Sequence, residues 1–186
     1  MSDQPPPFVH SVELGSLSER GAELRLAPDG AERARIAEWL GALEVPSFEA
    51  TVRLERAADD LYLYDADFTA QVVQACVVTL EPVPSTHAAR VSRRYRVVAP
   101  KTARRAQRDI AAAGGDDEDA PEVLSGTVLD IAAPVLEELS LALDPYPRAP
   151  GVTFELPKEE STPSDNPFAV LAKLKQSRPG EPEPRK

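Results

Sequence analysis

Polar and apolar residues alternate along the first half of the chain in the manner of β-strands. The alternation has a clean period of two across residues 48–55, and apolar residues again share one face across 61–64 and 66–80, with a break expected at Asp65. Weaker alternation predicts strands at 8–14 and 24–26, and another strand follows at 88–98, after Pro82 and Pro84 interrupt the pattern. Consecutive strands with short links predict an antiparallel β-meander of about five strands.

Two longer segments have the spacing of helices instead. Asp29 is placed to cap the first helix, with Glu32 as its capping-box partner, and Gly41 and Pro46 end it. Asp130 is expected to open the second helix, in which Pro134 falls within the first turn. Their apolar stripes comprise Ile36, Trp39, Leu40 and Leu43 in the first helix, and Ile131, Val135, Leu136, Leu139 and Leu143 in the second. The fold class predicted is α+β, with the sheet packed against both helices, and the pattern leaves open whether the sheet closes into a barrel.

The two ends of the chain have a different character. Residues 1–7 are expected to be disordered, and residues 8–157 to form one α+β domain with a flexible charged loop at 100–122. The proline-rich region 158–186 is interpreted as a linker, a short helix at 166–175 and a disordered tail. In that helix Asn166 caps, Pro167 takes the first position, and Phe168, Leu171 and Leu174 share one face. A helix this short needs a surface to bury against, either this chain's own core or, as the preceding linker slightly favours, a partner.

Composition narrows the class of protein. The 186 residues include 21 Lys and Arg against 31 Asp and Glu, a net charge of −10, which excludes a uniformly basic protein that coats nucleic acid. A single cysteine excludes an intrachain disulfide. No apolar run approaches the roughly 18 residues of a membrane helix, and residues 1–7 lack a secretory pattern, so a cytoplasmic protein is expected.

Little in the sequence points to catalysis. The two histidines, His10 and His87, belong to no recognisable nucleophile arrangement, and there is no glycine-rich phosphate loop. Cys76 lies on an apolar strand face and is interpreted as a core residue. We therefore expect a protein that is not an enzyme, with no catalytic or metal-binding residues, no cofactor and no small-molecule substrate.

A basic cluster is the sharpest local signal. Within 19 positions, uninterrupted by any acid, the chain carries Arg90, Arg93, Arg94, Arg96, Lys101, Arg104, Arg105 and Arg108. Strand alternation places Arg90, Arg94 and Arg96 on one face and Arg93 on the other. Guanidinium groups suit phosphate oxygens, so these eight residues are candidate nucleic-acid contacts. An equally weighted alternative is that Asp116, Asp117, Glu118, Asp119 and Glu122 fold back and neutralise the cluster.

Residues 166–175, Asn-Pro-Phe-Ala-Val-Leu-Ala-Lys-Leu-Lys, resemble the closing motif of the YceD-like family, which is named for accumulation of large-subunit ribosomal RNA. The helix over 130–143 and its proline-rich exit are similar to that family too. Cys76 falls where the family usually carries a Cys-x-x-Cys pair, but Thr79 stands at the second position, so no metal site is carried over.

The resemblance implies a non-enzymatic bacterial factor for large ribosomal subunit biogenesis and 23S rRNA accumulation. Its expected partners are precursor rRNA, a ribosomal protein, or both. The basic cluster is the expected RNA contact, and the expected partner-binding residues of the closing motif are Asn166, Pro167, Phe168, Leu171 and Leu174. The alternative is an acidic adaptor or chaperone-like module that holds a basic protein without touching RNA.

Overall fold

The computed structural model describes residues 6–102 and 120–153. The chain divides into two compact units, Met1–Val152 and Thr153–Lys186, and the fold below is that of the first. In chain order its elements are β1 (Ser11–Glu13), the 3₁₀ turn η1 (Leu14–Ser16), β2 (Ala22–Leu26), α1 (Gly30–Leu40), β3 (Glu44–Arg56), β4 (Leu61–Ala75), β5 (Pro82–Val98), β6 (Glu122–Ser125), β7 (Val128–Asp130) and α3 (Ala133–Ala142).

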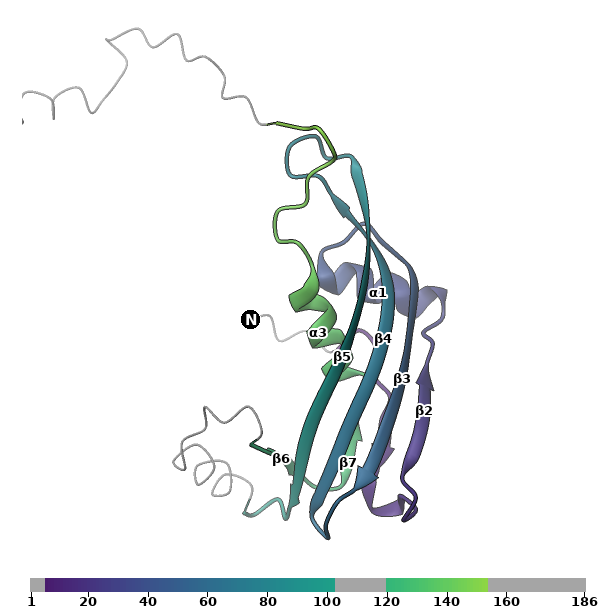
Figure 1. The fold of residues 1–186 in the computed structure, drawn as a ribbon, viewed down its shortest axis with the longest axis vertical. Coiled ribbons are helices and arrows are strands. Elements are labelled where there is room, and N and C mark those ends of the chain that lie inside the picture. The colour runs from purple at the N-terminus through teal and green to yellow at the C-terminus, as the bar shows by residue number, and fades with distance from the viewer. Residues whose placement is uncertain (1–5, 103–119, 154–186) are drawn as a thin grey trace, which may run out of the picture. The chain divides into compact units, whose positions relative to one another are not determined.

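Five strands form one sheet in the order β2-β3-β4-β5-β6 (Figure 1). The first four are antiparallel neighbours, whereas β6 runs parallel to β5. Because β2 and β6 lie at opposite edges, the sheet is open, which answers the question of barrel closure that the sequence left open. The α+β class and the two helices predicted from the sequence are confirmed. The sheet has five strands as expected, but it is an antiparallel meander only from β2 to β5, and the strand predicted at 8–14 lies outside it.

The sheet buries one face and exposes the other. Alternate residues of β3 and β4, from Phe48 to Leu54 and from Tyr62 to Val72, are buried, and their neighbours are mostly exposed. Ile36 of α1 and Leu139 of α3 belong to the same core, so both helices cover the buried face. β1 pairs with β7 as a separate two-stranded sheet. The opposite face of the five-stranded sheet is therefore available to solvent.

The first helix begins and ends as its sequence predicts. Asp29 accepts a hydrogen bond from the Glu32 amide, and the Glu32 carboxylate accepts one from the Asp29 amide. Gly41 ends the helix with φ of +66°, a conformation that glycine adopts without strain. The expectation that Leu43 completes the buried stripe is wrong: it lies beyond the helix end and is 57% exposed.

β4 is a single uninterrupted strand, so the expected break at Asp65 is absent. The strand predicted at 66–80 ends early, at Ala75, and Cys76 begins a tight turn. The turn is held by the Leu80 amide, which donates to the Cys76 carbonyl at 2.9 Å. Apolar residues inside the turn had continued the periodic pattern past the true end of the strand.

β5 begins at Pro82, six residues earlier than the strand predicted at 88–98. Pro82 and Pro84 pair with Ala75 and Val73 of β4 on one side only, because β6 reaches no further than Tyr95. Proline is tolerated at a strand edge because its missing N–H costs no ladder bond there. The prolines therefore mark an edge of the sheet and not the end of a strand.

The second helix starts at Ala133, three residues after Asp130. Asp130 instead ends β7, and its carboxylate accepts hydrogen bonds from the amides of Ala132 and His10. The strand predicted at 8–14 is shorter, with only Ser11–Glu13 in β1. The short strands β6 and β7 were missed, since three or four residues carry too little periodicity to be recognised.

Candidate nucleic-acid interface

β5 carries four of the eight basic residues proposed from the sequence: Arg90, Arg93, Arg94 and Arg96. Lys101 follows the strand and is exposed. The other three, Arg104, Arg105 and Arg108, lie outside the described residues, as do Asn166, Pro167, Phe168, Leu171 and Leu174 of the closing motif. The structure therefore locates half of the basic cluster on one strand of the sheet.

The strand divides these arginines between two faces, as the alternation predicted. Arg90 and Arg94 are exposed on the solvent face, and Arg96 lies in the same row with intermediate exposure. Arg93 lies on the other face, between the buried Val91 and Tyr95. A ligand at the solvent face would consequently meet Arg90, Arg94 and Arg96, whereas Arg93 belongs to a different environment.

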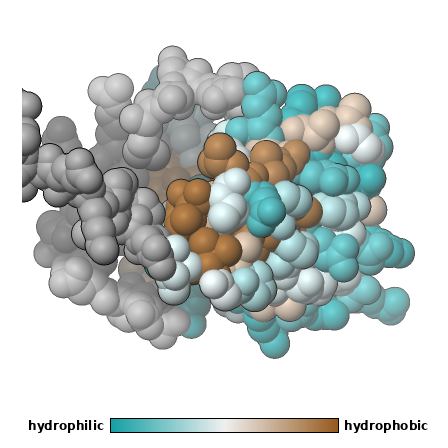
Figure 2. Space-filling model, turned by 90° about the horizontal axis from the view of Figure 1, so that it is seen from above, coloured by the Kyte–Doolittle hydropathy of each residue, from teal (hydrophilic) through white to brown (hydrophobic). Residues whose placement is uncertain are grey.

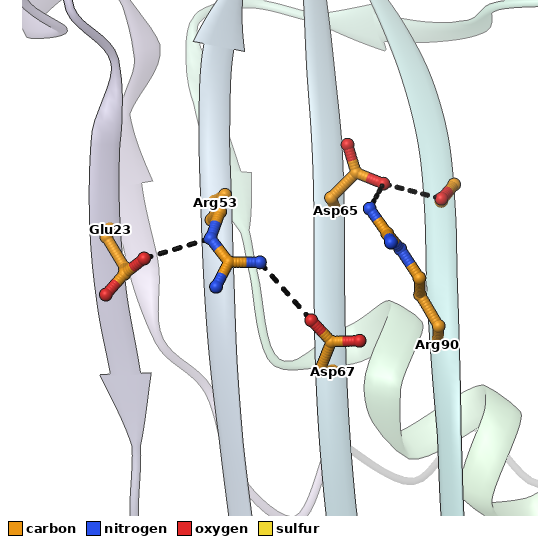
Figure 3. Close-up of polar contacts among 6 residues, drawn as sticks. Glu23, Arg53, Asp65, Asp67 and Arg90 are labelled. Carbon is orange, nitrogen blue, oxygen red and sulfur yellow. Dashed lines mark hydrogen bonds and ion pairs between the residues drawn. The ribbon is translucent and has the colours of Figure 1, made fainter.

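Arg90 contacts a carboxylate on the neighbouring strand (Figure 3). Its guanidinium lies 3.2 Å from Oδ1 of Asp65, and the hydroxyl of Ser92 donates to the same oxygen at 2.6 Å. The Ser92 hydrogen bond, followed by Arg90, holds the pKa of Asp65 below its usual value. Asp65 is thus kept ionised as the local counterion of Arg90.

Two more arginines of the strand have acidic neighbours. Arg96 lies 3.7 Å from a carboxylate oxygen of Asp60, and Arg93 lies 3.4 Å from Glu122. Glu122 is one of the acids that the neutralisation alternative named, whereas Asp60 and Asp65 come from the preceding turn and strand. The run of positive charge in the sequence is therefore interleaved with negative charge in space.

The rest of the solvent face has the same character. Arg53 of β3 lies between Glu23 of β2 and Asp67 of β4, at 2.9 and 3.3 Å (Figure 3). The hydrogen bond that Arg53 donates to the Glu23 carboxylate raises the pKa of Arg53. On β2, Arg25 contacts Glu49 of β3 at 2.8 Å. An anion would therefore have to exchange with existing carboxylate partners, which makes any phosphate contact here strongly dependent on salt.

A cavity of about 400 Å³ lies at the junction of β5 and β6, lined by Leu63, Tyr64, Asp65, Ser92, Arg93, Arg94, Ala120, Glu122 and Glu137. Burial raises the pKa of Glu122, and the Glu137 carboxylate adds to the rise while Arg93 opposes it. The charged lining thus comprises three carboxylates and two arginines, an arrangement suited to a polar or cationic side chain.

Cys76 is buried, as expected for a core residue, but its sulfur has polar partners that the sequence did not reveal. Backbone amides of Val78, Thr79 and Ala149 point at Sγ from 3.4 to 3.5 Å. Thr79, through its hydroxyl first, and the amide of Ala149 lower the pKa of the thiol to about 6. The sulfur therefore joins the β4–β5 turn to the segment that follows α3.

Other chemistry has limited support in the described part of the chain. Over residues 6–102 and 120–153, no three His, Cys, Asp or Glu side chains are grouped to hold a metal ion. The ring of His87 contacts the Ser85 hydroxyl at 2.8 Å, and residues 6–102 and 120–153 supply no third group that would orient this pair as a nucleophile site. Among the described helices, none has the length and apolar character needed to cross a membrane.

Comparison with known proteins adds the family. The family model described as "Large ribosomal RNA subunit accumulation protein YceD" matches residues 64–175, which is more than half of the chain. No curated protein and no solved structure matches significantly. The matched region takes in most of β4, the arginines of β5, Cys76, α3 and the closing motif that suggested the resemblance. The chain therefore belongs to the YceD family.

Proposed function

We propose that this protein is a non-enzymatic bacterial factor that works in the cytoplasm in the accumulation of large-subunit ribosomal RNA, by contacting precursor 23S rRNA. Membership of a family described by that role is the observation that supports the proposal. The arginine row of β5 is the RNA contact that we assign within the described residues, and Lys101, Arg104, Arg105 and Arg108 extend it along the chain.

The geometry of β5 suits a phosphate backbone. Arg90 and Arg96 project from the solvent face four residues before and two residues after Arg94, so the row follows an extended strand for about 20 Å. A guanidinium presents paired N–H donors that match two phosphate oxygens. One strand can therefore meet successive phosphates without reading base sequence.

The existing ion pairs do not prevent this exchange. The side chains of Arg90 and Asp65 are 63% and 36% exposed, and those of Arg96 and Asp60 are 43% and 57% exposed. Ion pairs at such positions typically contribute only about 0–1 kcal/mol. A polyanion that offers several phosphates together can displace them, while the acidic remainder of the molecule discourages nonspecific binding.

Charge reversal at two matched positions tests the RNA contact. Arg90→Glu and Arg25→Glu each reverse a strand arginine on the same face, 63% and 68% exposed and each beside one carboxylate. Binding to a precursor 23S rRNA fragment, measured across a salt series, should weaken for Arg90→Glu, with the salt slope reduced by about 1. Arg25→Glu should bind like the unchanged protein. Equal binding by both variants, with unchanged melting temperatures, would remove β5 from the interface.

The alternative function, an acidic holder for a basic protein, is favoured by the net charge of −10 and by the carboxylates beside Arg90, Arg93 and Arg96. Affinity purification from growing cells with and without nuclease separates the two. Large-subunit precursors that are lost on nuclease treatment support RNA contact. A basic protein retained after nuclease treatment, together with no binding to purified RNA, supports the holder.

A further inference from the structure

One edge of β5 is largely uncovered. The strand pairs with β4 from Pro82 to Arg96, but with β6 only over Tyr95–Val98. Among the residues that the structure describes, no strand pairs with the remaining edge. The ladder with β4 already holds this part of the β5 backbone in strand geometry, while its other side has no strand partner among the described residues.

Two hydrogen bonds at the ends of the β4–β5 ladder fix which backbone groups turn toward that side. The Val97 amide donates to the Asp60 carbonyl at 2.7 Å, and the Cys76 amide donates to the Glu81 carbonyl at 2.8 Å. Odd-numbered residues of this segment therefore direct N–H and C=O toward β4, and even-numbered residues direct them outward. Pro82 and Pro84, both even, conform to this pattern because neither interrupts the ladder.

We propose that the backbone of Thr86, Ala88, Arg90 and Ser92 is a strand-addition site for an extended segment of a partner protein. All four residues are exposed, and each directs its amide and its carbonyl outward. The Ser92 carbonyl accepts a hydrogen bond of 3.4 Å from the Arg93 guanidinium, which an amide of the added strand would share or replace. Such an alternating row of donors and acceptors pairs with another polypeptide backbone. It does not suit RNA, because the carbonyl oxygens would face anionic phosphates.

The neighbouring side chains define the chemistry of the partner. On the helix-covered face the edge carries Ala89 and Val91, which pack in the core or against it, so inward residues of the added strand should be apolar. On the solvent face it carries Arg90 and Ser92, which suit polar residues. The added strand is thus expected to alternate apolar and polar residues.

The ends of the site limit the length of the added strand and its terminal residue. Pro84 has no N–H to offer at one end, and β6 occupies the edge from Tyr95 at the other. At the β6 end lies the cavity of about 400 Å³, whose lining has three carboxylates, Asp65, Glu122 and Glu137, against two arginines, Arg93 and Arg94. A lysine or arginine at that end of the partner would offset the excess carboxylate. A second copy of this chain fits less well, because it would bring two arginine-bearing strands together.

Replacement of Ala88 by proline tests the site with little disturbance to the fold. Ala88→Pro removes an outward N–H and no bond to β4, at a position equivalent to Pro82 and Pro84. Ala88→Thr is the matched control, since it changes the side chain but keeps the amide. The probe is a synthetic peptide that alternates valine and threonine, with a lysine at each end. The same peptide N-methylated at alternate amides serves as a probe that cannot pair.

Amide hydrogen exchange gives a readout at the proposed atoms. With the peptide at ten times its dissociation constant, exchange at Thr86, Ala88, Arg90 and Ser92 should slow about tenfold. The Ala88→Thr variant should behave the same, and Ala88→Pro should lose the protection. The proposal would be overturned by exchange rates at these amides that do not change when the peptide is added, or by equal protection from the N-methylated peptide. Dimerisation through this edge would also overturn it. Arg90→Glu keeps its backbone amide, so loss of RNA binding in that variant with peptide protection retained would separate this site from the RNA contact.

Discussion

The hydroxyl of Tyr64 donates a hydrogen bond of 2.9 Å to the backbone carbonyl of Ile131. This bond joins the middle of β4 to the residue that links β7 with α3, and both residues are almost fully buried. The Tyr64 ring also meets Tyr95 of β5 edge to face, with centroids 6.2 Å apart. A single side chain thus connects β4 and β5 with the residue that leads into α3.

Removing that hydroxyl should weaken the fold. Tyr64→Phe leaves the Ile131 carbonyl buried without its side-chain donor, so we expect the free energy of unfolding to fall by about 1–3 kcal/mol. Tyr62→Phe is the control, because Tyr62 is equally buried in the same strand but forms no side-chain hydrogen bond among the described residues. Urea denaturation of the two variants measures the difference. A loss no larger for Tyr64→Phe than for Tyr62→Phe would show that the bond contributes little.

Much of the fold could be predicted because its signals are local. The capping box of Asp29 and Glu32 depends on four consecutive residues only. The division of the β5 arginines between two faces follows from the period of a strand alone. The apolar stripe of α3, including Leu139, likewise needs no knowledge of what it packs against.

The surroundings of the arginines could not be predicted in the same way. Asp65 faces Ser92 across the ladder and reaches Arg90 diagonally, a relationship that depends on the register between β4 and β5. That register is set by the turn after Ala75, which the apolar pattern concealed. The apolar pattern predicts that one strand runs to residue 80 and that the next begins at 88. With those bounds, no local feature of the sequence places Asp65 beside Ser92 and Arg90.

The thiol of Cys76 should make stability depend on pH. Its pKa is lowered from 9.0 to about 6 in the folded chain by Thr79 and the amide of Ala149, so between these values the folded protein has released a proton that the unfolded chain retains. Stability from this group is therefore present above pH 9, and it is lost as the pH falls toward 6. The urea midpoint of the unchanged protein should rise across this range relative to Cys76→Ser, whose hydroxyl accepts hydrogen bonds but does not titrate there. A constant difference between the two proteins would contradict the shift.

Leu80 combines an unfavourable backbone with an exposed side chain. Its φ is +63°, the left-handed region, and it is 76% exposed at the end of the β4–β5 turn. Val77 in the same turn and Tyr146, next to the Pro147 carbonyl that receives the Val77 amide, are also exposed. Figure 2 looks onto this end of the domain and shows apolar side chains gathered on it. Leu80 therefore gains little from burial to offset its backbone strain.

Replacing Leu80 by glycine should stabilise the protein. A residue other than glycine in the left-handed region costs roughly 1–2 kcal/mol, which glycine would remove. The greater freedom of glycine in the unfolded chain offsets about 0.4–1 kcal/mol of that stabilisation. We therefore expect Leu80→Gly to raise the free energy of unfolding by up to about 1 kcal/mol, measured as an increase in the urea midpoint. Leu80→Ala retains the strained Cβ and removes only exposed carbons, so it should leave the midpoint nearly unchanged. If alanine stabilised the protein as much as glycine, the exposed side chain and not the backbone would be the source of the cost.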